Sequence, residues 1–249
     1  MKHSLLCLAL ALVLLIAGVS GASAVELKYK FKKGSVEQYR ETRSLVYEFE
    51  FFSGNEKATT DEELSFRETV ESIEDGNAMI KLQSSYIKMV ENGEAVPKSE
   101  TPDDTFYYTL SPQGRVLSIL DADKKPEKHF EAKKEKDLLP RGDVKPGDSW
   151  EGCRSLQGEY VKAKYTLEKL DTQKGVKVAV IRFTVEDKID STEGDFKCMI
   201  DVTGKGVIYF ATELGTDILT ESELLCDVTS EGKPFAKTVI KTKKWRVAK

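Results

Sequence analysis

Apolar and charged residues alternate with a period of two along most of this chain, and this alternation constrains the fold more than any other feature. Tyr47, Phe49 and Phe51, for example, are separated by glutamates. Successive side chains of a β-strand point to opposite faces, so this pattern gives a strand with one apolar and one charged face. The same alternation recurs at 26–32, 64–70 and 78–82. We therefore predict an all-β protein.

Turn residues divide the rest of the chain into further predicted strands. These strands are expected at 105–111, 115–120, 159–170, 176–187, 194–203, 206–212, 216–228 and 234–247. Asp75-Gly76 is typical of a tight hairpin, since both residue types accept positive φ. Turn residues also occupy 111–114, 173–175 and 213–215. Many strands joined by such turns predict one large curved antiparallel sheet or an incomplete barrel.

The two halves of the chain resemble each other. Gly76 and Gly114 follow similar strand patterns in one half, and Gly175 and Gly215 follow them at nearly the same spacing in the other. Duplication of one unit explains the agreement, and chance similarity between hairpins is the alternative. We predict a single β-domain over 25–249, with pseudo-repeats at about 60–120 and 159–228 and a connector at 121–150.

The first 24 residues are predicted to be a cleavable signal peptide. Lys2 and His3 precede an apolar run from Leu5 to Val19, and Ala22-Ser23-Ala24 matches a small-residue cleavage site. An N-terminal membrane anchor is the alternative, although the apolar run is short for a span. Cleavage near Ala24/Val25 predicts a secreted or periplasmic protein, and the absence of an N-x-[ST] site favours a bacterial source.

The connector contains the one predicted helix, at 126–137. This segment is rich in helix-forming residues and has Pro126 at its start, where proline suits the first helical turn. It is interpreted as a solvated connection, with a lid over the sheet as the alternative. Trp150, at the end of the connector, is expected to close over the core.

Composition excludes several classes of protein. The chain has 40% hydrophobic and 32% charged residues and a formal net charge of −4. These values do not suit a multi-span membrane protein, a disordered chain or a dedicated nucleic-acid binder. Basic residues gather at 233–249. This basic end predicts an edge strand protected from pairing, with peripheral contact to an acidic membrane surface as the alternative.

The residues that commonly perform catalysis do not form a recognisable set. His129 is the only histidine after residue 24, so no nucleophile–base pair is predicted. Cys153, Cys198 and Cys226 lack the spacing of a zinc site, and a Cys198–Cys226 disulfide or free thiols are both open. Adjacent carboxylates at 62–63, 103–104 and 121–123 are expected by chance in so acidic a chain. We predict no catalytic residue, metal or cofactor.

A distinctive stretch follows the predicted helix, Val144-Lys145-Pro146-Gly147-Asp148-Ser149-Trp150. Together with the strand and turn pattern, it resembles a group of uncharacterised secreted bacterial β-proteins. These proteins are distantly similar to the periplasmic lipoprotein carriers of the LolA/LolB type. The resemblance implies a half-barrel whose concave face holds acyl chains.

These expectations combine into one functional hypothesis. The protein is predicted to bind an apolar ligand, such as a lipid or a lipoprotein, on the concave sheet face without catalysis. The candidate ligand-binding residues are Phe31, Phe49, Phe66, Val70 and Trp150. A structural or interaction scaffold of the cell envelope is the first alternative, and a carboxylate-dependent hydrolase is the second.

Overall fold

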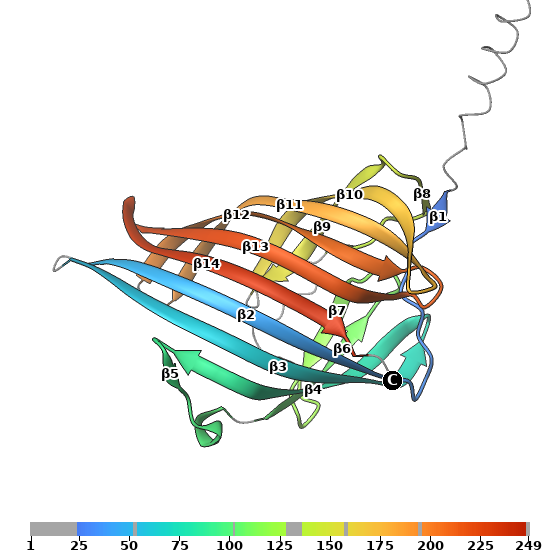
Figure 1. Ribbon diagram of the computed structural model, residues 1–249, viewed down its shortest axis with the longest axis horizontal. Coiled ribbons are helices and arrows are strands. Elements are labelled where there is room, and N and C mark those ends of the chain that lie inside the picture. Colours follow the sequence, from blue (N-terminus) through green and yellow to red (C-terminus); the bar gives the residue numbers. More distant parts are fainter. Residues whose placement is uncertain are drawn as a thin grey trace, which may run out of the picture.

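A computed structural model describes residues 24–51, 54–101, 103–127, 136–156, 159–193 and 196–247. Its strands are β1 (Val25–Glu26), β2 (Val36–Phe51), β3 (Gly54–Glu74), β4 (Asn77–Glu91), β5 (Glu94–Ala95), β6 (Asp104–Leu110), β7 (Val116–Leu120), β8 (Asp143–Val144), β9 (Ser149–Leu156), β10 (Glu159–Gln173), β11 (Val176–Glu193), β12 (Phe196–Ala211), β13 (Thr216–Ser230) and β14 (Lys233–Arg246). Within those ranges, the helical content is one 3-10 turn, η1 (Lys98–Glu100). The predicted all-β class is confirmed (Figure 1).

One antiparallel sheet of 12 strands dominates the molecule, in the order β7-β6-β4-β3-β2-β14-β13-β12-β11-β10-β9, with β5 paired to β4. Twisted open sheets rarely exceed about ten strands without curling. Accordingly, the sheet curls so that β6, β7, β9 and β10 lie behind its middle strands in the view of Figure 1. This confirms the predicted large curved sheet, whose edges are β7 and β9.

The hairpin turns lie where the glycines predict them. Asp75 has φ 49° and Gly76 has φ 81°, and Lys174 and Gly175 repeat this conformation with φ 49° and 80°. Two consecutive positive φ values match the right-handed twist of the flanking strands. The units β3-β4-β6-β7 and β10-β11-β12-β13 follow one another in the same order across the sheet. Duplication of these units remains a prediction.

The prediction of a sheet strand at 26–32 is wrong. Only Val25–Glu26 is a strand, and it pairs with β8 outside the large sheet. Residues 27–35, here called the N-terminal segment, pack against the sheet, with backbone hydrogen bonds from Tyr29 to Pro112 (2.7 Å) and from Lys30 to Gly215 (3.1 Å). The alternating apolar residues of this segment pack on the sheet face, with Leu27 fully buried and Tyr29 and Phe31 half-buried.

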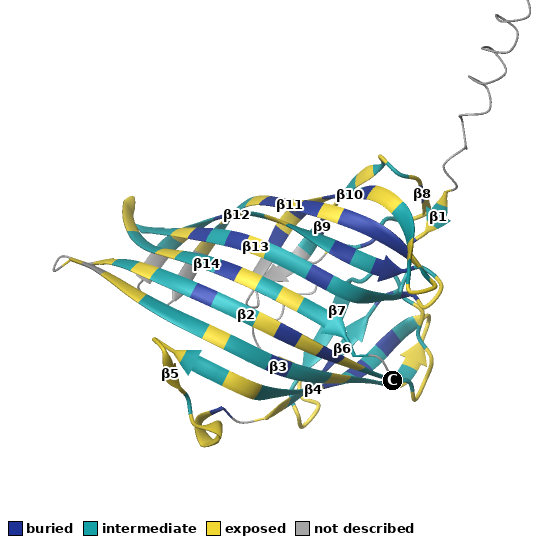
Figure 2. Cartoon of the chain, viewed as in Figure 1, coloured by how far each residue is buried: buried dark blue, intermediate teal, exposed yellow. Residues whose placement is uncertain are grey.

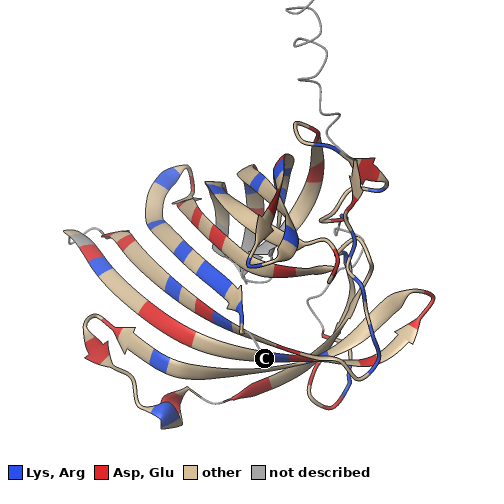
Figure 3. Cartoon of the chain, turned by 45° about the vertical axis from the view of Figure 1, so that its right-hand side comes forward, with Lys and Arg blue, Asp and Glu red and all other residues tan. Residues whose placement is uncertain are grey.

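The prediction that the basic C-terminal strand is an edge strand is also wrong. β14 lies between β13 and β2. Its lysines face acidic residues of β13, with Lys241 Nζ 3.5 Å from Glu223 and Lys243 Nζ 2.8 Å from Glu221. Figure 3 shows such basic and acidic bands across the sheet. Opposite charges on paired strands allow a basic strand in the middle of a sheet.

Both edges of the sheet are partly covered by the connector. At β7, Leu120 forms a bridge with Pro126, and the Glu127 amide donates to the Ile119 carbonyl at 3.0 Å. At β9, the Trp150 indole donates to the Leu138 carbonyl at 2.9 Å. Covered edges are less open to pairing with other chains. Most of the helix predicted at 126–137 falls on 128–135, outside the described residues.

Strand register defines the two faces of the sheet, because paired residues point to the same side. One row across the sheet is Glu62, Arg43, Thr242, Ser222, Gly206, Phe183 and Tyr165. The face that carries this row is called the inner face, and the opposite face is the outer face. The N-terminal segment packs on the inner face, since Leu27 and Tyr165 belong to one buried cluster.

The core fills the inner face over β10 to β14 and part of β2. Buried residues of this cluster include Leu45, Val161, Leu167, Ile181, Val202, Ile208, Phe210, Leu224 and Ile240. In Figure 2 the buried bands concentrate on β10, β11 and β12. Gly206 makes close packing possible here, because a Cβ atom at this position would overlap the ring of Phe183. No helix among the described residues is long and apolar enough to cross a membrane.

Candidate functional site

A pocket of about 300 Å³, here called the inner pocket, lies on the inner face beneath the N-terminal segment. Its apolar walls are Phe31, Val70, Ile80 and Leu110. Val70 and Ile80 belong to a second buried cluster, against which Phe31 and Leu110 pack. The volume is at the lower end of the range of ligand pockets. The inner pocket can therefore hold a small apolar molecule.

Tyrosine hydroxyls add hydrogen-bonding groups to the inner pocket. The Tyr29 hydroxyl donates to Asp217 Oδ2 at 3.2 Å, and the hydroxyls of Tyr39 and Thr216 share a hydrogen bond of 2.8 Å. Burial, followed by the charge of Asp217, raises the pKa of Tyr29 well above its usual value. Burial and then Glu68 raise the pKa of Tyr108 in the same way. Both phenols therefore keep their protons at neutral pH.

Two ion pairs complete the inner pocket. The Lys244 ammonium is 3.6 Å from Glu68 Oε1, and Arg246 Nε is 2.5 Å from Glu37 Oε2. Lys244 also stands over the Tyr39 ring, 4.5 Å from its centroid. The pocket thus combines apolar walls with a few polar groups, which is the usual composition of a small-molecule site.

The five predicted ligand-binding residues do not form one site. Phe31 and Val70 line the inner pocket together. Phe66 is next to them, with Lys244 Nζ 5.5 Å from its ring centroid. Trp150 lies elsewhere, stacked on Tyr165 at 5.9 Å between ring centroids.

Phe49 belongs to a separate region, here called the distal strip. This region comprises half-buried apolar residues that continue the inner face beyond the core: Tyr47, Phe49, Ile189, Ile200 and Val228. The rings of Tyr47 and Phe49 stack with centroids 6.1 Å apart. Half-buried apolar side chains grouped on a concave face offer a second apolar contact surface.

A charged cluster separates the inner pocket from the distal strip on β2. The Arg43 guanidinium donates to Glu41 Oε1 from Nη2 at 2.7 Å and to Glu62 Oε2 from Nη1 at 3.2 Å. The Glu41 and Glu62 side chains are only 10% and 9% exposed. Burial raises the pKa of Glu62, and Arg43 opposes this shift. The cluster interrupts the apolar lining between the two regions.

Sequence reasoning missed the charged groups of the inner pocket, although a signal was present. Glu68 stands between Phe66 and Val70 at a position of the alternation that points inward. Lys243 and Lys244 are consecutive, so one of them must point to the inner face of a strand. A charge at an inward position indicates a polar site within an apolar face.

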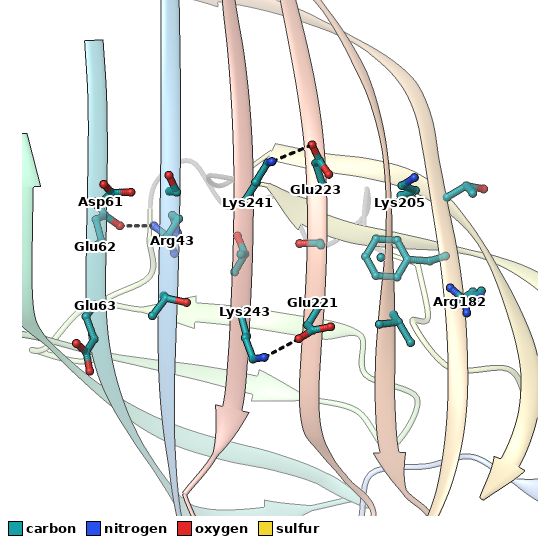
Figure 4. A pocket seen from close by; sticks show the side chains of 18 of the residues that line it. Arg43, Asp61, Glu62, Glu63, Arg182, Lys205, Glu221, Glu223, Lys241 and Lys243 are labelled. Atoms are coloured by element: carbon teal, nitrogen blue, oxygen red, sulfur yellow. Dashed lines mark hydrogen bonds and ion pairs between the residues drawn. The ribbon is translucent and has the colours of Figure 1, made fainter. Parts of the chain in front are cut away.

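The outer face carries a shallow groove of about 860 Å³ that runs across the strands from β4 to β11, here called the outer groove. Figure 4 shows the pairs Lys241–Glu223 and Lys243–Glu221 on adjacent strands within it. The four side chains are 43–63% exposed. Exposed ion pairs of this kind contribute little energy and are easily hydrated. Exposed and hydrated charges therefore form part of the lining of the outer groove.

The adjacent carboxylates at 62–63, considered for hydrolysis, point to opposite faces of the sheet. Glu62 points to the inner face with Arg43, whereas Glu63 pairs with Thr42 on the outer face and contacts Arg40 at 3.1 Å. Asp121 accepts hydrogen bonds from the amides of its own turn. Among the described residues, no group of three or more His, Cys, Asp or Glu side chains could hold a metal ion. His129 lies outside the described residues.

Of the cysteines that the structure describes, Cys198 and Cys226 are free thiols. Cys198 pairs in register with Ser230, and Cys226 pairs with Val202. The register therefore places Cys198 and Cys226 several positions apart along the paired strands β12 and β13, so they do not form a disulfide. Burial raises the pKa of the Cys226 thiol.

Comparison with known proteins supports the fold. No family model matches the chain, and no curated protein matches it. A solved structure described as lipid–protein interactions in lipovitellin matches with a TM-score of 0.52 and 10% sequence identity, covering 88% of this chain. This chain spans only 26% of the length of that protein. At this identity the likeness shows a shared sheet architecture.

Two further structures align over most of the chain but differ more in shape. They are the S-type phycobiliprotein lyase CPES from Guillardia theta, with a TM-score of 0.30, 11% identity and coverage of 86% of this chain and 89% of that one, and DynF from Micromonospora chersina, with a TM-score of 0.25, 10% identity and coverage of 91% and 85%.

Proposed function

We propose that this protein binds an apolar ligand on the inner face of its curved sheet and performs no catalysis. The inner pocket carries this proposal, since Phe31, Val70, Ile80 and Leu110 surround an open volume. Burying each large apolar side chain in a filled core would contribute roughly 1.5–3 kcal/mol. An open pocket lacks part of this stabilisation, and an apolar ligand bound in the pocket would supply it.

Two further observations support a lipid-like ligand or a lipid-bearing partner such as a lipoprotein. The distal strip offers more half-buried apolar surface on the same face of the sheet. The sheet also shares its architecture with part of lipovitellin, a protein whose structure is described for its lipid–protein interactions. We include in this proposal the resemblance of the sequence to the lipoprotein carriers of the LolA/LolB type.

We also propose that the protein is secreted or periplasmic. Cleavage after Ala24 would leave Val25 as the first residue, and β1 begins at Val25. Processing would therefore keep the β1–β8 pair intact. The intact mass of the protein from its native source tests this step, and a mass that includes residues 1–24 would contradict secretion with cleavage.

The binding proposal is tested with N-phenyl-1-naphthylamine, an uncharged probe that fluoresces in apolar sites. We expect saturable binding to the wild-type protein. Phe31→Asp places a charge in the apolar wall and should weaken binding at least about tenfold, because burying an unpaired carboxylate is costly. Lys32→Asp, at the exposed neighbouring position, is the matched control and should bind the probe as the wild type does.

Circular dichroism must show that both variants keep their strand content. Equal probe affinity in the two variants would locate binding outside the inner pocket. If the wild-type protein binds no probe, the apolar-ligand proposal fails and the scaffold interpretation takes its place.

A further inference from the structure

The charges around the inner pocket are balanced. Its lining contains the bases Lys30, Lys244 and Arg246 and the acids Glu37, Glu68 and Asp217. Arg246 is paired with Glu37, and Lys244 with Glu68. A ligand that brought a net charge into this pocket would leave one charge without compensation in a largely apolar surrounding, which is costly. The balance therefore favours an uncharged ligand.

Lys244 has unused hydrogen-bond donors at the pocket. Its ammonium is 3.6 Å from Glu68 Oε1, a distance too long for a good hydrogen bond. Its other contacts are the faces of Tyr39 and Phe66, at 4.5 and 5.5 Å from the ring centroids. Within the described part of the chain, Lys244 Nζ makes no hydrogen bond. A lysine ammonium carries three donors.

Glu68 provides the complementary acceptor. Its side chain is only 18% exposed, and ionised carboxylates accept several hydrogen bonds at once. Donor and acceptor thus stand side by side in the lining of the pocket, which also contains the apolar residues Phe31, Val70 and Ile80. A hydroxyl group can accept from an ammonium and donate to a carboxylate at the same time.

We propose that the inner pocket binds an uncharged apolar molecule through a hydroxyl group that accepts a hydrogen bond from Lys244 and donates one to Glu68. The inference rests on the proposed function and names the chemical class of its ligand: a medium-chain alcohol or another hydrocarbon with one hydroxyl. A carboxylate brings a net charge, and an ether of the same length has no donor for Glu68.

The test measures displacement of N-phenyl-1-naphthylamine by three compounds at pH 7.5: 1-decanol, decanoate and 1-methoxydecane. We expect 1-decanol to displace the probe at a concentration at least about tenfold lower than either of the others, since each lacks one requirement of the site. Lys244→Met should raise the concentrations of 1-decanol and of 1-methoxydecane that displace the probe severalfold, because both ligand oxygens lose their donor. Lys243→Met is the matched control and should leave both concentrations unchanged, because Lys243 is on the outer face with Glu221.

Glu68→Gln provides a second variant, should Lys244→Met fail to fold. Its amide cannot replace the charged acceptor, so the preference for 1-decanol should shrink severalfold. Equal displacement by the alcohol and the ether in the wild type, or a preference for decanoate, would overturn this inference while apolar binding stands. Failure of the probe to bind at all would instead remove the proposed function itself.

Discussion

Phe183 belongs to the buried cluster on the inner face, and its removal tests whether this region is a filled core. The ring is 2% exposed, lies 5.8 Å from Tyr165 between centroids, and covers Gly206. Truncating a fully buried phenylalanine to alanine costs about 3–5 kcal/mol. We expect Phe183→Ala to lower the free energy of unfolding by about 4 kcal/mol, a large share of the 5–15 kcal/mol typical of native proteins.

Urea denaturation followed by circular dichroism measures this loss. With a slope of about 2 kcal/mol/M, the midpoint should fall by about 2 M. Thr184→Ala is the matched control, because Thr184 is the next residue on β11 and is exposed on the outer face. Its effect should stay within about 0.5 kcal/mol. A loss below about 1.5 kcal/mol for Phe183→Ala would refute the assignment of this region as filled core.

Three further predictions follow from packing and titration. Gly206→Ala should lower the free energy of unfolding by about 1–3 kcal/mol in urea denaturation, because its Cβ would overlap the Phe183 ring and the Glu221 carbonyl oxygen; an unchanged midpoint would contradict the register there. The pKa of Tyr108 is raised, so the contribution of Tyr108 to stability should be constant below about pH 10 and fall above it, as the unfolded chain ionises first. In Tyr108→Phe, stability should fall less steeply between about pH 10 and 11 than in the wild type. An equal slope in the two proteins would contradict the raised pKa of Tyr108. Cys226, buried and with a raised pKa, should react with iodoacetamide more than about tenfold more slowly than the half-buried Cys198 by peptide mass spectrometry.

Local patterns predicted the strands well because strand formation and hairpin turns depend on neighbouring residues. The alternation at Tyr47 and Phe49 and the turn at Asp75-Gly76 both have their expected structures. The errors concern partners that are distant in sequence. The N-terminal segment alternates like a strand, but whether it pairs with the sheet or packs on it depends on the β6–β7 and β12–β13 turns that receive it.

The inner pocket was only half predictable for the same reason. Phe31 and Val70 follow from alternation, which identifies apolar inward positions. The polar lining of the pocket joins Glu68 on β3 with Lys244 on β14, two strands that are separated by β2 in the sheet. Only the long-range pairing of β14 with β2 brings these groups together.

The meeting of β2 and β14 in the middle of the sheet has a consequence for how the chain folds. Each half of the sheet is a run of sequential hairpins that can form from local contacts, but the halves join only where the two ends of the chain pair. Glu37 and Arg246, which form an ion pair at this junction, are 209 positions apart. Contacts between residues so far apart in the sequence form slowly, so the two halves of the sheet should assemble before β2 and β14 pair. The apolar face of the first half therefore stays exposed until the last strand, β14, is available to pair with β2.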